Sequence, residues 1–116
     1  VHDPKAKVLA TREGHVMCAA NTFGRGRSVF LAGLPFSFAN ARLLHRAIFW
    51  AAGREQELKR WHTSNVLTDT AYFPKSRAWV VVNHDARPQA TTVYDGQGKP
   101  RRVSLKAYES NWLREG

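Results

Sequence analysis

The apolar run at residues 28–34, SVFLAGL, most limits what this chain can fold into. A strand with one face in water alternates apolar and polar residues, whereas this run is apolar at nearly every position. Such a strand is typical of the interior of a sheet that is covered by helices on both faces. Pro35 ends the run, and only one helix is predicted in this half of the chain. We therefore expect part of an α/β domain rather than a complete one.

Two shorter strands are predicted before this run. Residues 7–11 and 15–21 have the composition of strands, and Glu13-Gly14 between them is a turn dipeptide. The predicted order for this half is therefore strand, strand, strand, helix.

The stretch FGRGR at residues 23–27 raises the question of a phosphate-binding loop. Loops of that kind connect a strand to a helix, so that the free N–H groups at the helix N-terminus face the anion. Here the glycines precede a strand, and the helix begins later. We expect a turn between strands in which Gly24 or Gly26 takes a positive φ angle.

A helix is predicted after Pro35. Ser37 or Asn40 can cap its N-terminus, it runs to about Ala52, and Gly53 stops it. Apolar residues at spacings of three and four form one stripe along it. The junction at residues 33–37 between strand and helix could place a ligand, but it lacks convergent polar groups and is better explained as a bend.

After Gly53 the composition changes. Residues 54–60, REQELKR, are charged and form helices readily, and we expect a linker helix over residues 54–64. No helix is predicted beyond it, and short strands recur at intervals of about ten residues, as in a small sandwich or barrel. The predicted strands are 66–73, 78–83, 90–95 and 101–105.

The expected fold class is therefore α+β, in three segments. Residues 1–53 are the C-terminal part of an α/β domain with three strands and one helix. Residues 54–64 are the linker helix, and residues 65–116 are a small antiparallel all-β domain. Each half is short enough that burial is marginal and folding alone is uncertain.

The 18 basic and 9 acidic residues give a net charge of +9, which raises the possibility of nucleic-acid binding. The arginines are scattered, however, and only Arg101-Arg102 are adjacent, so we expect a diffuse positive charge and no specific nucleic-acid partner. No apolar run is long enough to cross a membrane. The single Cys18 cannot form an internal disulfide, which favours a reducing, cytoplasmic setting. Because the first residue is Val1, we expect a piece of a longer chain.

No catalytic, cofactor or metal site can be assembled from the residue pattern. Cys18 lies in an apolar strand without an activating partner, and we expect it in the core. None of the histidines has a metal-ligand spacing, although His84-Asp85 on a loop leaves a site at the sheet end open. A pair of carboxylates for glycoside chemistry is conceivable among the 9 acidic residues, but nothing singles out two. The histidines are His2, His15, His45, His62 and His84.

The four tryptophans could stack on sugar rings if they shared one exposed sheet face. We expect Trp50 and Trp61 on helices, where an interface between the halves would bury them. Trp79 opens an apolar strand and is expected in the core of the small sheet. Aromatic rings more often supply buried area, and a carbohydrate-binding surface that includes Trp112 stays a rival interpretation.

Two stretches resemble a known family. The run AANTFGRGRSVFLAGLPFSFANARLLHRAIFWAAG is similar to the end of the glutamine-amidotransferase-like α/β domain of 1,3-β-galactosyl-N-acetylhexosamine (lacto-N-biose or galacto-N-biose) phosphorylases. The later stretches ELKRWHTSN and WVVVNHDARPQATTVYDGQGKPRRVSL resemble their small C-terminal all-β domain. The first stretch also fits related domains in β-galactosidases, so the second points more specifically to the phosphorylases.

The resemblance implies a parent enzyme that splits a β-1,3-linked galactosyl-hexosamine with phosphate, with inversion, into α-galactose 1-phosphate and free N-acetylhexosamine. It implies that the general acid and the sugar- and phosphate-binding residues lie on an N-terminal barrel domain. No position in this sequence matches those motifs, so no catalytic residue is carried over. The expected partners are the remaining N-terminal domains and a possible second copy of the enzyme, with no metal or other cofactor.

Overall fold

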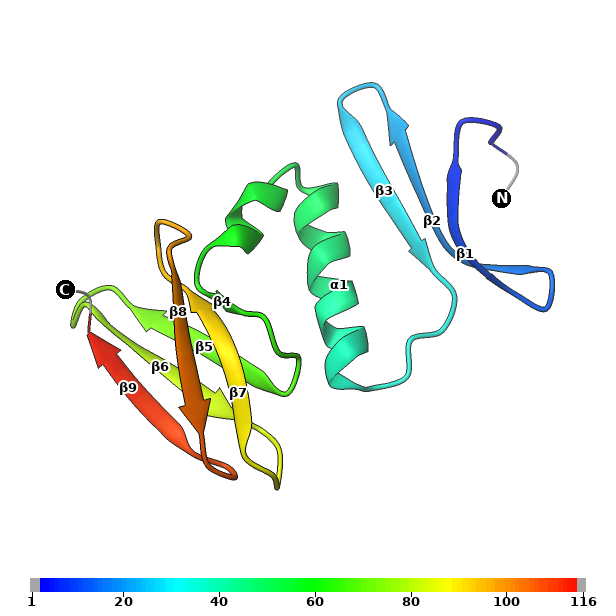
Figure 1. Ribbon diagram of the computed structural model, residues 1–116. Helices are drawn as coiled ribbons and strands as arrows, with labels where there is room; N and C mark the ends of the chain where they lie inside the picture. Colours follow the sequence, from blue (N-terminus) through cyan, green and yellow to red (C-terminus); the bar gives the residue numbers. More distant parts are fainter. Residues whose placement is uncertain (1–2, 115–116) are drawn as a thin grey trace. The chain divides into compact units, whose positions relative to one another are not determined.

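The computed structural model describes residues 3–114 and divides the chain into two compact units, Val1–Glu55 and Gln56–Gly116 (Figure 1). The first unit is a three-stranded sheet with one α-helix, and the second is made of strands. The chain is thus rich in antiparallel β-structure, as the sequence indicates.

The sheet of the first unit is antiparallel, in the order β1-β2-β3. Its strands are β1 (Lys7–Arg12), β2 (His15–Phe23) and β3 (Gly26–Leu31). The turn between β2 and β3 passes through Gly24 at φ 55°, a conformation that glycine adopts at little cost. The three predicted strands and the glycine turn are therefore confirmed.

The apolar run on β3 is less buried than its composition predicts. β3 lies at an edge of the sheet, and Phe30 on it is 51% exposed. The central strand β2 holds Cys18 and Ala19, the buried residues of the described part of this unit. The expectation of burial on both faces is not met within these residues, because the unit supplies one helix and that helix packs on β3 from one side.

Side-chain alternation shows which face of β3 the helix covers. Arg27 on β3 reaches Trp50 of the helix, with its guanidinium carbon 5.1 Å from the ring centroid. Val29 and Leu31 share the face of Arg27, whereas Phe30 points to the other side of the sheet. The side of the sheet that carries Phe30 therefore has no layer over it in the described part of this unit.

Helix α1 (Phe38–Ala51) begins and ends where the sequence predicts. The Ser37 hydroxyl accepts a hydrogen bond from the Asn40 N–H at 3.0 Å, which satisfies one of the donors at the helix start. Gly53, at φ 68°, turns the chain after the helix. No helix among residues 3–114 is long and apolar enough to cross a membrane.

The linker helix predicted over residues 54–64 is wrong in extent and type. Glu55–Lys59 form a short 3₁₀ helix, η1, and Trp61 has a left-handed φ of 48°. The next two residues are the strand β4 (His62–Thr63). Strand pairing of β4 and stacking of the Trp61 ring on Tyr72 outweigh the local helix propensity of this segment.

The second unit contains two three-stranded antiparallel sheets, ordered β4-β7-β8 and β5-β6-β9. The four strands predicted from the sequence are present, three of them with ends shifted by one or two residues, whereas β4 and β9 were not predicted. The remaining bounds are β5 (Thr68–Phe73), β6 (Ala78–Asn83), β7 (Gln89–Tyr94), β8 (Pro100–Leu105) and β9 (Ser110–Arg114).

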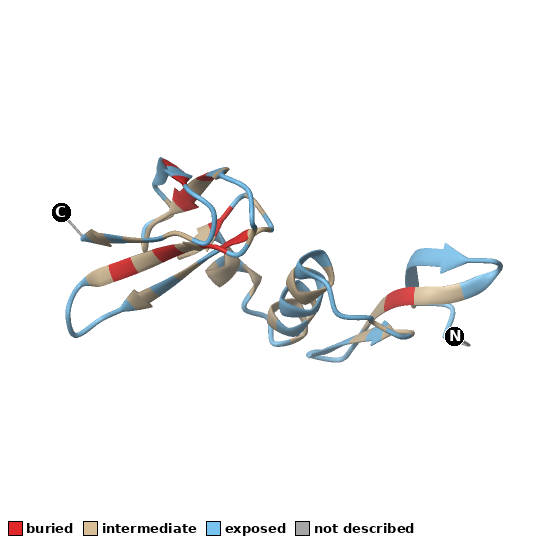
Figure 2. Cartoon of the chain, turned by 90° about the horizontal axis from the view of Figure 1, so that it is seen from below, coloured by how far each residue is buried: buried red, intermediate tan, exposed pale blue. Residues whose placement is uncertain are grey.

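The two sheets share one hydrophobic core, so that the second unit is a small sandwich. Figure 2 shows its buried residues on alternate positions of the strands, whereas the first unit is mostly exposed. Trp79 is buried, as predicted, and Trp61, Tyr72 and Leu113 pack against the cluster. The core residues are Trp79, Val81, Val93, Val103 and Leu105.

We expect Val81→Ala to destabilise the second unit by about 2 to 3 kcal/mol, because it removes two buried methyl groups and leaves a cavity. Val81 is 0% exposed. The matched control is Val80→Ala on the same strand. The Val80 side chain points away from the core, so its truncation should lower the free energy of unfolding by less than about 1 kcal/mol. Urea unfolding of both variants, followed by tryptophan fluorescence, measures the difference. Equal losses would show that the core does not lie where the strand alternation places it.

Candidate functional site

The residues that could carry nucleophilic or metal chemistry are dispersed. Cys18 is buried on β2, as expected for a core residue. His15 begins β2, His45 lies on α1, His62 lies on β4 and His84 follows β6, while His2 lies outside the described residues. Within residues 3–114, no three His, Cys, Asp or Glu side chains are grouped so that they could hold a metal ion.

The glycine turn positions Arg27 for a structural contact. Its Nη1 donates to the two carboxylate oxygens of Glu55 at 3.0 and 3.1 Å and to the carbonyl oxygen of Trp50 at 3.2 Å. The guanidinium group thus ties β3 to the end of α1. This geometry supports the interpretation of FGRGR as a turn rather than a phosphate-binding loop.

The tryptophans of the second unit do not share one exposed face. Trp61 stacks on Tyr72, with ring centroids 3.9 Å apart, and meets the buried Trp79 edge-on at 5.1 Å. Trp112 is 61% exposed and lies beside Phe73, with the ring centroids 5.5 Å apart. The expectation that Trp61 lies on a helix is wrong, because it follows η1 with a left-handed φ of 48°. Among the described residues of this unit, the three tryptophans do not form a row on which sugars could stack.

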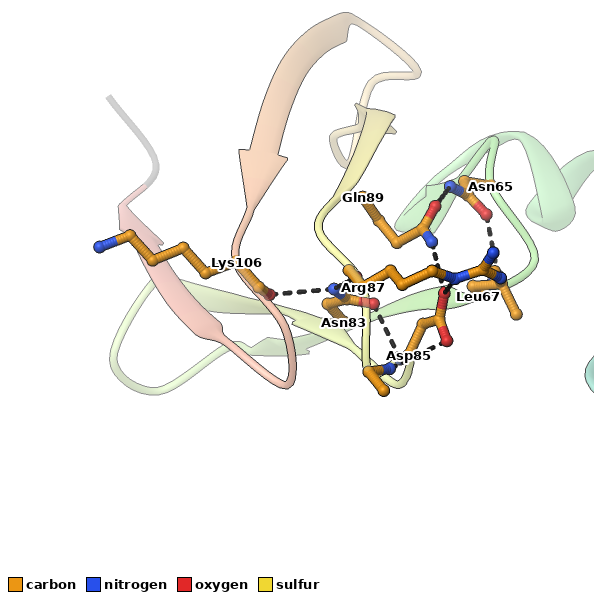
Figure 3. Close-up of polar contacts among 8 residues, drawn as sticks. Asn65, Leu67, Asn83, Asp85, Arg87, Gln89 and Lys106 are labelled. Atoms are coloured by element: carbon orange, nitrogen blue, oxygen red, sulfur yellow. Dashed lines mark hydrogen bonds and ion pairs between the residues drawn. The ribbon is translucent and has the colours of Figure 1, made fainter.

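A cluster of polar side chains surrounds the loop after β6 (Figure 3). At its centre is Asn83, which is 1% exposed. Its amide nitrogen donates to the carbonyl oxygens of Arg87 at 2.8 Å and Lys106 at 2.9 Å, and its amide oxygen accepts from the Asp85 N–H at 2.9 Å. One side chain therefore fixes the β6–β7 loop against the turn that follows β8.

Asp85 and Gln89 extend the cluster towards β4. The Asp85 carboxylate accepts from the Gln89 amide nitrogen at 2.6 Å and from Nε of Arg87 at 3.3 Å. The oxygen of the Gln89 amide accepts from the Asn65 amide nitrogen at 2.9 Å, and the Asn65 oxygen accepts from the Leu67 N–H at 3.0 Å. A continuous chain of hydrogen bonds thus connects three loops at one end of the sandwich.

The cluster holds the loops at this end of the sandwich in place. Its amide and carboxylate groups point at one another and at main-chain groups, and they do not converge on an open cavity (Figure 3). His84 and Asp85, the residues that left a sheet-end site open, belong to this end of the sandwich. The sequence contained a usable signal, because Asn and Asp two residues apart favour side-chain hydrogen bonds to local main-chain N–H groups.

Among residues 3–114, three carboxyl groups have a pKa below the ordinary value. Hydrogen bonds from the main chain of Lys5 lower the pKa of Asp3, with help from Asn21. The pKa of Glu55 is lowered by its main-chain N–H and by Arg27. The main-chain N–H groups of Lys99 and Gln97 lower the pKa of Asp95. A general acid in glycoside cleavage needs the opposite shift, so none of these three groups is suited to that role.

Comparison with known families and proteins adds an independent line of observation. The profile of the lacto-N-biose phosphorylase central domain matches residues 1–56, and that of the lacto-N-biose phosphorylase C-terminal domain matches residues 61–113. The chain belongs to the 1,3-β-galactosyl-N-acetylhexosamine phosphorylase family, as part of its C-terminal portion.

Individual relatives agree with the two domain matches. A 1,3-β-galactosyl-N-acetylhexosamine phosphorylase of Lachnoclostridium phytofermentans is 45% identical over 108 residues, which are 93% of this chain and 15% of that protein. The enzyme of the same name from Bifidobacterium longum subsp. longum is 44% identical over 98 residues, 84% of this chain and 13% of its own length. A D-galactosyl-β-1→4-L-rhamnose phosphorylase of Lachnoclostridium phytofermentans is 37% identical over 78% of this chain and 12% of its own length. The chain thus spans about 15% or less of these relatives.

We expect Asn83→Ala to destabilise the second unit by about 2 to 3 kcal/mol, because it leaves two carbonyl oxygens and one N–H at the loop without their partner. Chemical unfolding of the chain measures the loss. Gln97→Ala, at an exposed position, is the control and should change the free energy of unfolding by less than about 0.5 kcal/mol. A variant as stable as the parent chain would show that the cluster does not fix the loops.

We expect the contribution of Asp95 to stability to disappear in acid. Because its folded pKa lies below the ordinary 3.8, ionised Asp95 stabilises the folded state above pH 3.8, and this is lost as the pH falls through the lowered pKa. Asp95→Asn removes the charge and keeps an oxygen that can accept the two N–H groups. Urea unfolding from about pH 6 to about pH 2 should show the parent more stable at the higher pH and the two proteins converging in acid. A pH-independent difference would contradict this linkage.

Proposed function

We propose that this chain is a non-catalytic C-terminal segment of an inverting glycoside phosphorylase. The parent enzyme cleaves β-1,3-galactosyl-N-acetylhexosamine with inorganic phosphate and releases α-galactose 1-phosphate and N-acetylhexosamine. The observation that carries the proposal is the order of two domains of one enzyme family along a single chain, residues 1–56 and then 61–113.

The chemistry of such a reaction supports a non-catalytic role for these residues. A carboxylic acid must protonate the leaving oxygen while phosphate attacks the anomeric carbon from the opposite face. Asp3, Glu55 and Asp95 have lowered pKa values, which keep them ionised. Asp85, the acidic residue of the cluster around the β6–β7 loop, accepts hydrogen bonds from Gln89 and Arg87. We assign the general acid and the phosphate site to the parts of the enzyme outside this chain, with no metal required.

The incomplete first unit also supports the proposal. Its sheet is covered by α1 on the face of Arg27 and Val29, while Phe30 on the other face is 51% exposed. We propose that residues 1–53 complete a glutamine-amidotransferase-like α/β domain whose remaining layers cover these apolar residues. Residues 54–64 then link it to the all-β domain of residues 65–116.

The names of the relatives favour phosphorolysis over hydrolysis. The matched proteins described above are phosphorylases, which supports a phosphorylase rather than a β-galactosidase as the parent. We propose an N-acetylhexosamine as the released sugar, because the two relatives with 45% and 44% identity carry that specificity in their names and the rhamnose enzyme is 37% identical. The lone, buried Cys18 is compatible with a cytoplasmic enzyme.

The test is an assay of the complete protein encoded by the gene that contains this sequence, beside the 116-residue chain. With galactosyl-β-1,3-N-acetylhexosamine and phosphate, the complete protein should form α-galactose 1-phosphate, and the 116-residue chain should form none. Circular dichroism melting of the chain controls for folding. Release of galactose without phosphate would make the parent a hydrolase, and turnover by the chain alone would refute the non-catalytic role.

A further inference from the structure

The outer face of the β5-β6-β9 sheet is unusually apolar for a surface in water. Trp79 and Val81 of β6 point into the core, so Val80 and Val82 point outwards. Register places Ala71 of β5 and Trp112 of β9 on either side of Val80. We name this surface the outer β6 face. It consists of Ala71, Phe73, Ala78, Val80, Val82 and Trp112, with Asp69, Ser110 and Arg114 at its margins.

The other sheet of the same sandwich does not share this character. Thr91 and Val93 of β7 are buried, so that Thr92 and Tyr94 point outwards. Thr92 pairs with Arg102 of β8, and Ala90 with Ser104. An antiparallel sheet with one face on the core and one in water is expected to be polar outside, as this sheet is. The outer β6 face departs from that rule in the same small domain.

The aromatic side chains of the outer β6 face are exposed, and contact of so much apolar area with water is unfavourable if no partner covers the face. Trp112 is 61% exposed and Phe73 is 44% exposed. A hollow of about 200 Å³ lies on the same face, lined by Ala71, Val80 and Val82 together with the polar residues Asp69, Thr70 and His84. Contiguous apolar patches of this kind mark surfaces that are covered by a partner.

The size of the face indicates what kind of partner covers it. Three strands about 4.8 Å apart and about five residues long present a footprint on the order of 250 Å². A stable complex between separate proteins buries about 800 Å² on each partner. A face this small is too small to hold a second, independent molecule by itself. It suffices for a neighbouring domain of the same polypeptide, because covalent connection supplies a high effective concentration.

We propose that the outer β6 face docks against a domain of the same polypeptide that lies outside residues 1–116. This inference rests on the proposed function, in which the chain is part of a longer enzyme. Docking there anchors the C-terminal sandwich through an apolar surface centred on Val80 and Trp112.

The first test is hydroxyl-radical labelling of the complete protein, read out by mass spectrometry. Trp112 should be labelled at least about tenfold more slowly in the complete protein than in the 116-residue chain, whereas Tyr94 on the polar sheet should react at similar rates in both. Equal labelling of Trp112 in the two proteins would overturn the proposal, and so would protection already present in the 116-residue chain.

The second test compares two substitutions in the complete protein. Val80→Glu places a charge on the outer β6 face and should make the sandwich at least about tenfold more sensitive to limited proteolysis, while Thr92→Glu on the polar sheet should have no effect. If Val80→Glu prevents folding, the labelling of the unmutated protein still decides the question. Protection of Trp112 that is lost on dilution, together with dissociation in sedimentation, would mean a second copy as partner and would overturn the proposal.

The outcomes separate this inference from the proposed function. Phosphorolysis by a complete protein with an unprotected Trp112 would leave the function standing and refute the docking. Protection of Trp112 in a protein that does not phosphorolyse the disaccharide would refute the function and support the docking.

Discussion

The alternation of side chains across antiparallel strands, and the need to cover the apolar set, determines what each half of this chain can do. In the second unit two sheets turn their apolar sets towards each other and bury Val81 and Val93 completely. In the first unit one sheet meets one helix, and the buried residues of its described part are Cys18 and Ala19. Because hydrophobic stabilisation grows with the apolar area removed from water, the described part of the first unit gains less stabilisation from its own packing than the second unit does.

Hydrogen bonds stabilise the loops at the end of the sandwich, whereas apolar packing stabilises its middle. Asn83 spans the β6–β7 loop and the turn after β8, and Asp85, Gln89 and Asn65 carry the hydrogen bonds on towards β4. A buried amide that lost these partners would destabilise the fold, so the residue types in this cluster are tightly restricted. The stretch NHDARPQ therefore supplies several of the contacts that determine the geometry of the loops at this end of the sandwich.

The helix ends and the tight turn were predicted correctly, because each depends on one or two neighbouring residues. Ser37 and Gly53 bound α1, and Gly24 turns β2 into β3, because caps and positive φ angles depend on single residues. The sequence did not predict β4 or β9, which are short and exist through pairing with distant strands. The prediction of Trp61 on a helix was wrong because its contact with Tyr72 is not visible in the local sequence pattern. The hydrogen-bond chain from Asn83 to Asn65 could be suspected only as loop chemistry, because its members come from three separate loops.

Charge contributes less to function than the net value of +9 suggests. Arg27 is held by Glu55, Arg87 contacts Asp85, and Arg101 lies 5.9 Å from the Trp79 ring centroid, so these cations are used inside their own unit. The field of the others is screened over about 8 Å at physiological ionic strength. Such a field can enrich phosphate or a sugar phosphate near the surface, but it cannot orient either for attack at an anomeric carbon. The positive charge of this segment therefore supplies no oriented anion site by itself, and its apolar faces are the stronger candidates for contact with other domains.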